Sequence, residues 1–297
     1  MLACLLLRPL LFLSFFAAVF AATASAPTSR RAHIILSPLP NGTLETYAAA
    51  WAALGDPATA RGGHTAVLPA YALDPGGGLS LADGGASLER FGVPALRACS
   101  PPPRMYGGVA LTDDAALALL ESNATRFAAQ LAARGRLLGL SGWELSYAPT
   151  RGGGGGGGFT PFLGALAALL GAQGVELSVA AQGCPDSGGL SCSAAAALPG
   201  VLAVTTWDAR HVASVCALEA LQDLDGDPGT GAGGKWAPQL APGEGGGATF
   251  VTSATFLATL GACYPCVQFL SAAPLPAWPQ PPWFWGSVNA FVDTPLQ

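Results

Sequence analysis

The sequence has few charged residues and almost no lysine. Only 10% of its 297 residues are Asp, Glu, Lys or Arg, the formal net charge is -5, and Lys235 is the sole lysine. A protein that holds a nucleic-acid backbone needs clustered Lys or Arg side chains to neutralise the phosphates. Because the sequence contains no basic patch, we expect no nucleic-acid partner.

Complete motifs for metal, nucleotide or serine-hydrolase chemistry are also missing. No Gly-x-Ser-x-Gly elbow occurs, and the three histidines lack metal-ligand spacing: His33, His64 and His211. Residues 229–235 match the glycine and lysine positions of a P-loop, but Trp236 stands where the Mg²⁺-binding Ser or Thr belongs. Residues 223–227 begin like a calcium loop, and Pro228 then replaces the turn glycine, which leaves weak Ca²⁺ binding as a minor alternative. We therefore expect no metal and no cofactor.

The longest apolar run lies at the start of the chain. Arg8 is the only charged residue before the apolar residues 10–22, and the small residues that follow fit a cleavage site after Ala24. The run is shorter than the ~20 residues of a spanning helix, so cleavage is favoured over an uncleaved anchor. No later stretch is apolar enough to cross a bilayer. We predict a signal peptide over residues 1–24, one domain over residues 25–297, no membrane contact after cleavage, and secretion, with a vacuole or lysosome as the alternative.

Two features are typical of a secreted chain. Asn41 and Asn123 each begin an Asn-x-Thr triplet, which predicts N-glycosylation. Six of the seven cysteines follow the predicted signal peptide, and an even number in an oxidising compartment favours disulfide bonds. Cys184 and Cys192 share a short loop rich in Pro and Gly, so we predict a disulfide bond between them.

Beyond residue 32, apolar runs typical of strands alternate with helical runs rich in Ala and Leu. The predicted strands are residues 33–36, 65–68, 104–111, 137–147, 175–181, 201–207, 267–270 and 284–288. A helix is expected at residues 43–54 with Thr43 as its cap, and a loop is expected from residue 222 to residue 247. This alternation predicts an α/β fold, a (β/α)8 barrel of the TIM type, with a doubly wound open sheet as the alternative. We expect the last helix to be incomplete.

Three segments carry a family resemblance. Residues 139–150 read Gly-Leu-Ser-Gly-Trp-Glu-Leu-Ser-Tyr-Ala-Pro-Thr. They resemble the fourth strand of glycoside hydrolase family 18, the chitinase family, which reads roughly Gly-Leu-Asp-Gly-x-Asp-x-Asp-Trp-Glu-Pro-Thr. Residues 204–208 are similar to the Met-x-Tyr-Asp element of that family, and residues 106–108, Tyr-Gly-Gly, match its Ser-x-Gly-Gly in part. A tryptophan near the end, Trp285 or Trp283, is a further similarity.

The resemblance implies a glycan-binding barrel whose catalytic strand has changed. In that family, a Glu on the fourth strand protonates the glycosidic oxygen, and a neighbouring Asp steadies the acetamido group of the substrate, which is the nucleophile. In a gapless alignment Ala148 stands at the Glu position, Ser146 at that Asp position, Glu144 at the inner Asp position and Ser141 at the first Asp position. An alanine methyl group cannot donate a proton, so the alignment implies impaired or lost catalysis.

A second register would make Glu144 the acid, because Trp143-Glu144 mimics the Trp-Glu of the family. That register loses the match at Pro149 and Thr150. It also places the carboxyl four residues before position 148, which is ~13 Å deeper in a strand that rises ~3.3 Å per residue. Active sites of such barrels lie at the C-terminal rim. The gapless register is therefore preferred.

The leading hypothesis is a secreted, chitinase-like barrel that binds a polysaccharide or oligosaccharide and has impaired catalysis. Its predicted glycan contacts are Trp207, Trp285, Tyr147 and Tyr106, with core packing as the alternative for the two tryptophans, and Asp208 would line the same cleft. The second hypothesis is an active O-glycosyl hydrolase that uses Glu144 or Asp208 as its acid. The third is a secreted structural or interaction protein without a glycan cleft.

Overall fold

The computed structural model describes most of the chain between residues 31 and 208 and two later strands. The described residues are 31–52 without 37 and 40, 64–147 without 112–117 and 121, 159–181, 195, 198–208, 236–240 and 266–270. Of residues 202–208, 236–240 and 266–270 it describes the backbone. No helix within these ranges is long and apolar enough to cross a membrane.

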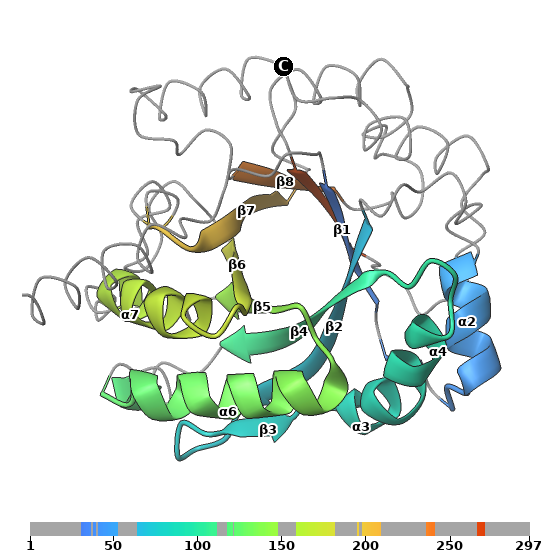
Figure 1. Ribbon diagram of the computed structural model, residues 1–297, viewed down its shortest axis with the longest axis horizontal. Coiled ribbons are helices and arrows are strands. Elements are labelled where there is room, and N and C mark those ends of the chain that lie inside the picture. Colours follow the sequence, from blue (N-terminus) through green and yellow to red (C-terminus); the bar gives the residue numbers. More distant parts are fainter. Residues whose placement is uncertain are drawn as a thin grey trace, which may run out of the picture.

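Eight parallel strands form a closed ring. In ring order they are β1 (Arg31–Ile35), β2 (His64–Leu73), β4 (Arg104–Leu111), β5 (Gly142–Tyr147), β6 (Glu176–Ala181), β7 (Val201–Asp208), β8 (Trp236–Leu240) and β9 (Cys266–Leu270). Each strand pairs in parallel with the next, and β1 pairs with both β2 and β9, which closes the barrel (Figure 1). This confirms the predicted (β/α)8 barrel and excludes the open sheet, because an open sheet would leave β1 with one neighbour.

The helices lie outside the ring (Figure 1). They are α2 (Leu44–Ala52), the continuous segment α3 (Gly85–Ser87), η1 (Leu88–Gly92) and α4 (Val93–Arg97), then α6 (Ala124–Leu138) and α7 (Phe159–Gly171). Thr43 caps α2 as predicted, since its Oγ1 accepts the N–H of Thr46 at 3.3 Å. The helices pack on the outward side chains of the strands and so form the apolar core with them.

The fourth strand of the ring begins later than predicted. Residues 137 and 138 belong to α6, and β5 starts only at Gly142. Gly139 ends the helix with a φ of 58°, a left-handed conformation that glycine adopts without strain, and its N–H is bonded to the carbonyl of Arg136. The apolar pair Leu137-Leu138 therefore reflects the end of an amphipathic helix, not the start of a strand.

Two strands lie outside the predicted set, and one of them lies where a loop was expected. β8 falls inside the predicted loop of residues 222–247, which makes β9 the eighth strand of the ring and not the seventh. Its central Pro238 lacks an N–H donor, so the segment does not read as a barrel strand. The short strand β3 (Leu79–Leu81) pairs antiparallel with β2 outside the ring. The predicted strand at residues 284–288 lies outside the described residues.

Candidate functional site

The side chains of β5 alternate between the barrel interior and the outer layer. Trp143 points outward: its Nε1 donates to the carbonyl of Leu131 in α6 at 3.1 Å, and its ring packs edge-on against Tyr71. Because neighbouring residues of a strand point to opposite faces, Gly142, Glu144 and Ser146 face the interior. The contacts of Trp143 therefore fix the orientation of the strand that carries the family resemblance.

Glu144 lies deep in the barrel between two other strands. Its side chain is 3% exposed, and its Oε2 accepts a hydrogen bond of 3.3 Å from Ser178 Oγ on β6. Nδ1 of His33 on β1 lies 3.4 Å from the same oxygen, and the His33 side chain is 2% exposed. These contacts with β6 and β1 hold the Glu144 carboxyl group in place and away from solvent.

The next inward position toward the mouth of the barrel is Ser146. It lies level with Ala110 of β4 and Ala180 of β6, and it is partly exposed where Glu144 is buried. Counting on by two gives position 148, an alanine that lies outside the described residues. Within the described part of β5, the sole carboxyl group thus lies below the partly exposed rung at Ser146.

A second polar cluster lies at the N-terminal ends of β4, β5 and β6. The hydroxyl of Tyr106 and the guanidinium of Arg104 both donate to Oε2 of Glu176. The fully buried ring of Tyr106 reaches Glu176 by crossing Gly142, and it packs edge-on against His33 with centroids 5.4 Å apart. The two clusters are therefore in contact, through His33 and Tyr106.

The structure separates the two tyrosines that were predicted to bind a glycan. Tyr106 faces the interior, but its hydroxyl points to the N-terminal end of the strands. Tyr147 lies on the outer face of β5, 4% exposed, with its ring stacked on Phe159 of α7 at a centroid distance of 4.2 Å. Tyr147 is thus part of the outer core. An odd position on this strand cannot share a face with Glu144 and Ser146.

The backbone of Asp208 lies at the C-terminal end of β7 and pairs with Gln239. In the ring, β7 is separated from β5 by β6 alone, so the fold brings both strand ends to the same rim. The side chains of Trp207 and Asp208 lie outside what the structure describes, as do Trp285 and the predicted disulfide of Cys184 with Cys192. Their predicted roles stay predictions.

The predicted modification sites are accessible. Asn41 lies in a turn before α2 and Asn123 directly precedes α6, and both are exposed. Cys99 has a free thiol that donates to the carbonyl of Ala95, and burial raises the pKa of this thiol. No group of His, Cys, Asp and Glu residues within the described part of the chain is arranged to hold a metal ion.

Four residues of the two polar clusters were not predicted from the sequence: His33, Arg104, Glu176 and Ser178. A signal for them existed, because counting by two along each predicted strand gives the inward set. Ser178 lies directly beside Glu144 in the strand register. Its neighbour across the barrel, His33, could not be assigned in this way, since contacts across a barrel depend on the stagger of the strands.

Comparisons with known proteins support the fold. No family model matches the sequence, and no curated protein matches it. Among solved structures, the catalytic domain of a family GH18 chitinase from the fern Peteris ryukyuensis is similar, with a TM-score of 0.64, 13% identity, and coverage of 89% of this chain and 100% of that one. A chitinase from Chromobacterium violaceum has a TM-score of 0.58 at 13% identity and covers 90% of this chain and 100% of its own.

A third similar structure contains a ligand. Catalytic domain 2 of the Group II chitinase from Ostrinia furnacalis, a mutant in complex with (NAG)5, has a TM-score of 0.54 at 12% identity and covers 71% of this chain and 64% of its own. At such identities the similarity shows the fold. The chain therefore has the barrel fold of chitinase-like structures, as the resemblance of residues 139–150 implies.

Proposed function

We propose that this protein is a secreted, chitinase-like barrel that binds glycans built from N-acetylglucosamine and has lost most or all hydrolytic activity. The observation that supports the proposal is the burial of Glu144, one inward position deeper than the partly exposed Ser146. Trp143 packs outward, so Glu144 and Ser146 are the inward residues, and Glu144 is held in the interior by His33 and Ser178. Both alignment registers place Glu144 on the inward face, and its burial supports the gapless one, in which Ser146 and Ala148 stand at the positions of the two carboxyl groups that act on substrate.

The loss of activity follows from the chemistry of the reaction. General acid catalysis typically contributes ~10²–10⁴-fold to the rate. A serine at position 146 also removes the negative charge that would stabilise a charged intermediate. Glycan binding needs neither carboxyl group, because sugar rings can pack on aromatic side chains. The chitinase fold and the ligand of the Ostrinia furnacalis structure support an N-acetylglucosamine oligomer as the glycan.

The test measures binding and turnover on the same preparation of the secreted protein. We expect calorimetry to detect saturable binding of an N-acetylglucosamine pentamer, while release of chromophore from a chromogenic chito-oligosaccharide stays near the rate of the buffer. Absence of binding would instead favour a structural or interaction protein.

The alternative of an active glycosidase has its own variants. If turnover is found, Glu144→Gln and Asp208→Asn identify the acid, and Glu45→Gln is the matched control, because Glu45 is an exposed residue on α2 far along the chain from both. Turnover that is abolished by either of the first two substitutions, and unchanged by the control, would contradict the proposed loss of catalysis.

A further inference from the structure

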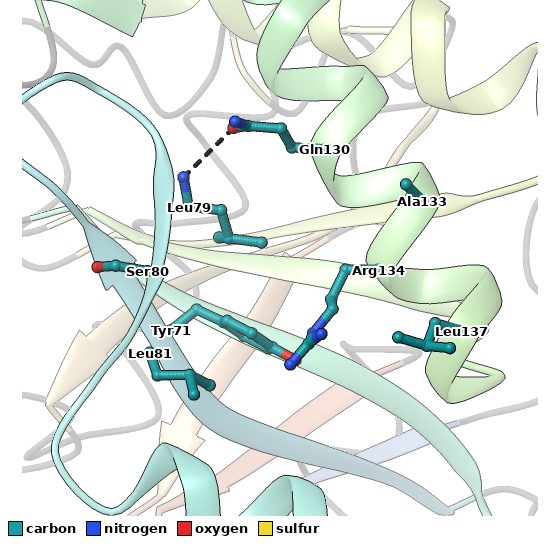
Figure 2. Close-up of a pocket in the computed structure, with 8 residues that line it drawn as sticks. All are labelled: Tyr71, Leu79, Ser80, Leu81, Gln130, Ala133, Arg134 and Leu137. Atoms are coloured by element: carbon teal, nitrogen blue, oxygen red, sulfur yellow. Dashed lines mark hydrogen bonds between the residues drawn. The ribbon is translucent and has the colours of Figure 1, made fainter.

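A cavity of about 490 Å³ lies outside the barrel, between the β2–β3 hairpin and α6 (Figure 2). Its volume falls in the ~300–1,000 Å³ range of small-molecule sites. It is separate from the interior of the barrel, because its lining residue Tyr71 belongs to the outward core of β2. Neither the interior clusters nor the proposed glycan site uses it.

One side of the cavity is apolar and open to solvent. Leu79 and Leu81 of β3 face Ala133 and Leu137 of α6 across it (Figure 2). Leu137 is 68% exposed and Leu81 is 46% exposed. Within the described residues, four large apolar side chains are exposed to 42% or more, and two of them line this one cavity. Exposed apolar groups gathered around a hollow are typical of a binding site for an apolar group.

The polar side offers hydrogen-bond donors. Arg134 donates from Nε and Nη2 to the carboxylate of Glu89. These two bonds do not use the Nη1 group of Arg134. Oε1 of Gln130 accepts a hydrogen bond of 3.3 Å from the N–H of Leu79. This bond does not use the Nε2 group of Gln130. The two residues are one turn apart on α6 and both point toward the cavity (Figure 2). Within the described residues no hydrogen bond uses either of these two groups, so both are available to a ligand that carries an acceptor.

We propose that this cavity binds a small amphipathic carboxylate, with its alkyl chain between the leucines of β3 and α6 and its carboxylate at Gln130 and Arg134. Hydrogen bonds to a charged acceptor are stronger than those to a neutral one, and the planar guanidinium suits a carboxylate. Glu89 already neutralises part of the Arg134 charge. The preference for a carboxylate over an alcohol of the same length is therefore moderate, about tenfold, which corresponds to one charge-assisted hydrogen bond.

The experiment titrates the full mature chain with decanoate, below its micelle concentration, in a calorimeter. We expect one saturable site, with decanol bound about tenfold more weakly. Leu137→Ser weakens decanoate about tenfold through lost apolar contact, and because Leu137 is largely exposed this variant keeps the fold. The matched control is Leu44→Ser, a leucine of α2 that is 43% exposed and distant in the fold, and it binds as the wild type does.

A further variant tests the polar end alone. Gln130→Glu keeps an oxygen for the N–H of Leu79 and replaces the donor with a negative charge, so it weakens decanoate and changes the binding of decanol much less. The proposal is overturned if decanoate shows no saturable binding, if Leu137→Ser and Leu44→Ser bind it equally well, or if decanol binds as tightly as decanoate. Since the ligand and the site differ from those of the glycan, this result is independent of the proposed function.

Discussion

Gly142 is a position where the size of a side chain decides the structure of the interior. A Cβ atom there would lie 2.9 Å from Cε1 of Tyr106 and 2.8 Å from the carbonyl oxygen of Glu176. The ring of Tyr106 is fully buried with its hydroxyl bonded to the Glu176 side chain, and the carbonyl oxygen belongs to the paired backbone of β6, so neither neighbour can move away easily. Gly142 is thus required by the second polar cluster.

Gly142→Ala should lower the free energy of unfolding by about 1–3 kcal/mol, the usual effect of overpacking a core. Urea denaturation measures it. Gly171→Ala is the matched control, because Gly171 is at the end of α7 with nothing within 4 Å of an added Cβ, and alanine there should be neutral or slightly stabilising. Equal stability of the two variants would show that Tyr106 does not cross Gly142 as described.

The hydroxyl group of Thr65 is a buried polar group on β2. Thr65 is fully buried, and its Oγ1 has no hydrogen-bond partner among the residues that the structure describes. Thr65→Val keeps the shape and removes the polar atom, so we expect unfolding free energy that is unchanged or higher by up to about 1 kcal/mol. Thr65→Ala, which also removes a methyl group, should destabilise. A loss of more than about 1 kcal/mol in Thr65→Val would mean that the hydroxyl is in fact hydrogen-bonded.

At the scale of elements, a hydrogen-bonded polar tie of Tyr71, Glu89 and Arg134 connects β2, η1 and α6. The hydroxyl of Tyr71 donates to Glu89, and Arg134 binds the same carboxylate through two nitrogens. Burial, and then the hydrogen bond with Glu89, raise the pKa of Tyr71 above its ordinary value of 10.0. The folded protein therefore keeps this proton at a pH where the unfolded chain loses it, and the contribution of Tyr71 to stability declines as the pH rises above 10.0.

Tyr71→Phe tests this tie. At pH 8 the variant should be about 1.5–3 kcal/mol less stable than the wild type, because one hydrogen bond to a charged group is lost. At pH 11 the difference should be smaller, since only the wild type carries the penalty of keeping its proton. Denaturation of both proteins at the two pH values gives the comparison. A difference that stays constant between pH 8 and pH 11 would contradict the raised pKa.

The elements that could be predicted from the sequence are those with a clear local pattern. Residues 104–111 and 175–181 form apolar runs of strand length, and they agree with β4 and β6 to within a residue. β8 was missed because Pro238 and the surrounding glycines resemble a loop, and only pairing with β7 and β9 makes the segment a strand. The start of β5 was misplaced because Leu137 and Leu138 are apolar in either structure. Alternation along β5 assigns Glu144 and Ser146 to the interior and, applied strictly, excludes Tyr147 from it, whereas the contact of Glu144 with His33 depends on the whole ring.

For the whole molecule, passage through the secretory pathway is a prediction from the sequence with a direct test. We expect the protein expressed in a eukaryotic secretory host to begin near Ser25 and to carry glycans at Asn41 and Asn123, both of which are exposed. A non-reducing peptide map should join Cys184 to Cys192. Mass spectrometry of the secreted protein decides each point. An intact N-terminus together with unmodified asparagines and free thiols would contradict a secreted protein.

The central claim is that a chitinase-type barrel has been kept while its proton donor has been lost. The fold is that of chitinases, yet β5 presents a buried Glu144 and, one inward position higher, Ser146. If the rest of the barrel still holds the glycan, Ser146→Asp combined with Ala148→Glu should raise hydrolysis above that of the unmodified protein, by up to the ~10²–10⁴-fold that a general acid contributes.

The most direct measurement is the turnover of a chromogenic chito-oligosaccharide by the unmodified, secreted protein at an enzyme concentration high enough to detect one turnover per hour. We expect no release of chromophore above the buffer rate, together with binding of the same oligosaccharide. Turnover at the rate of an ordinary chitinase, abolished by Glu144→Gln or Asp208→Asn and unaffected by Glu45→Gln, would contradict this expectation.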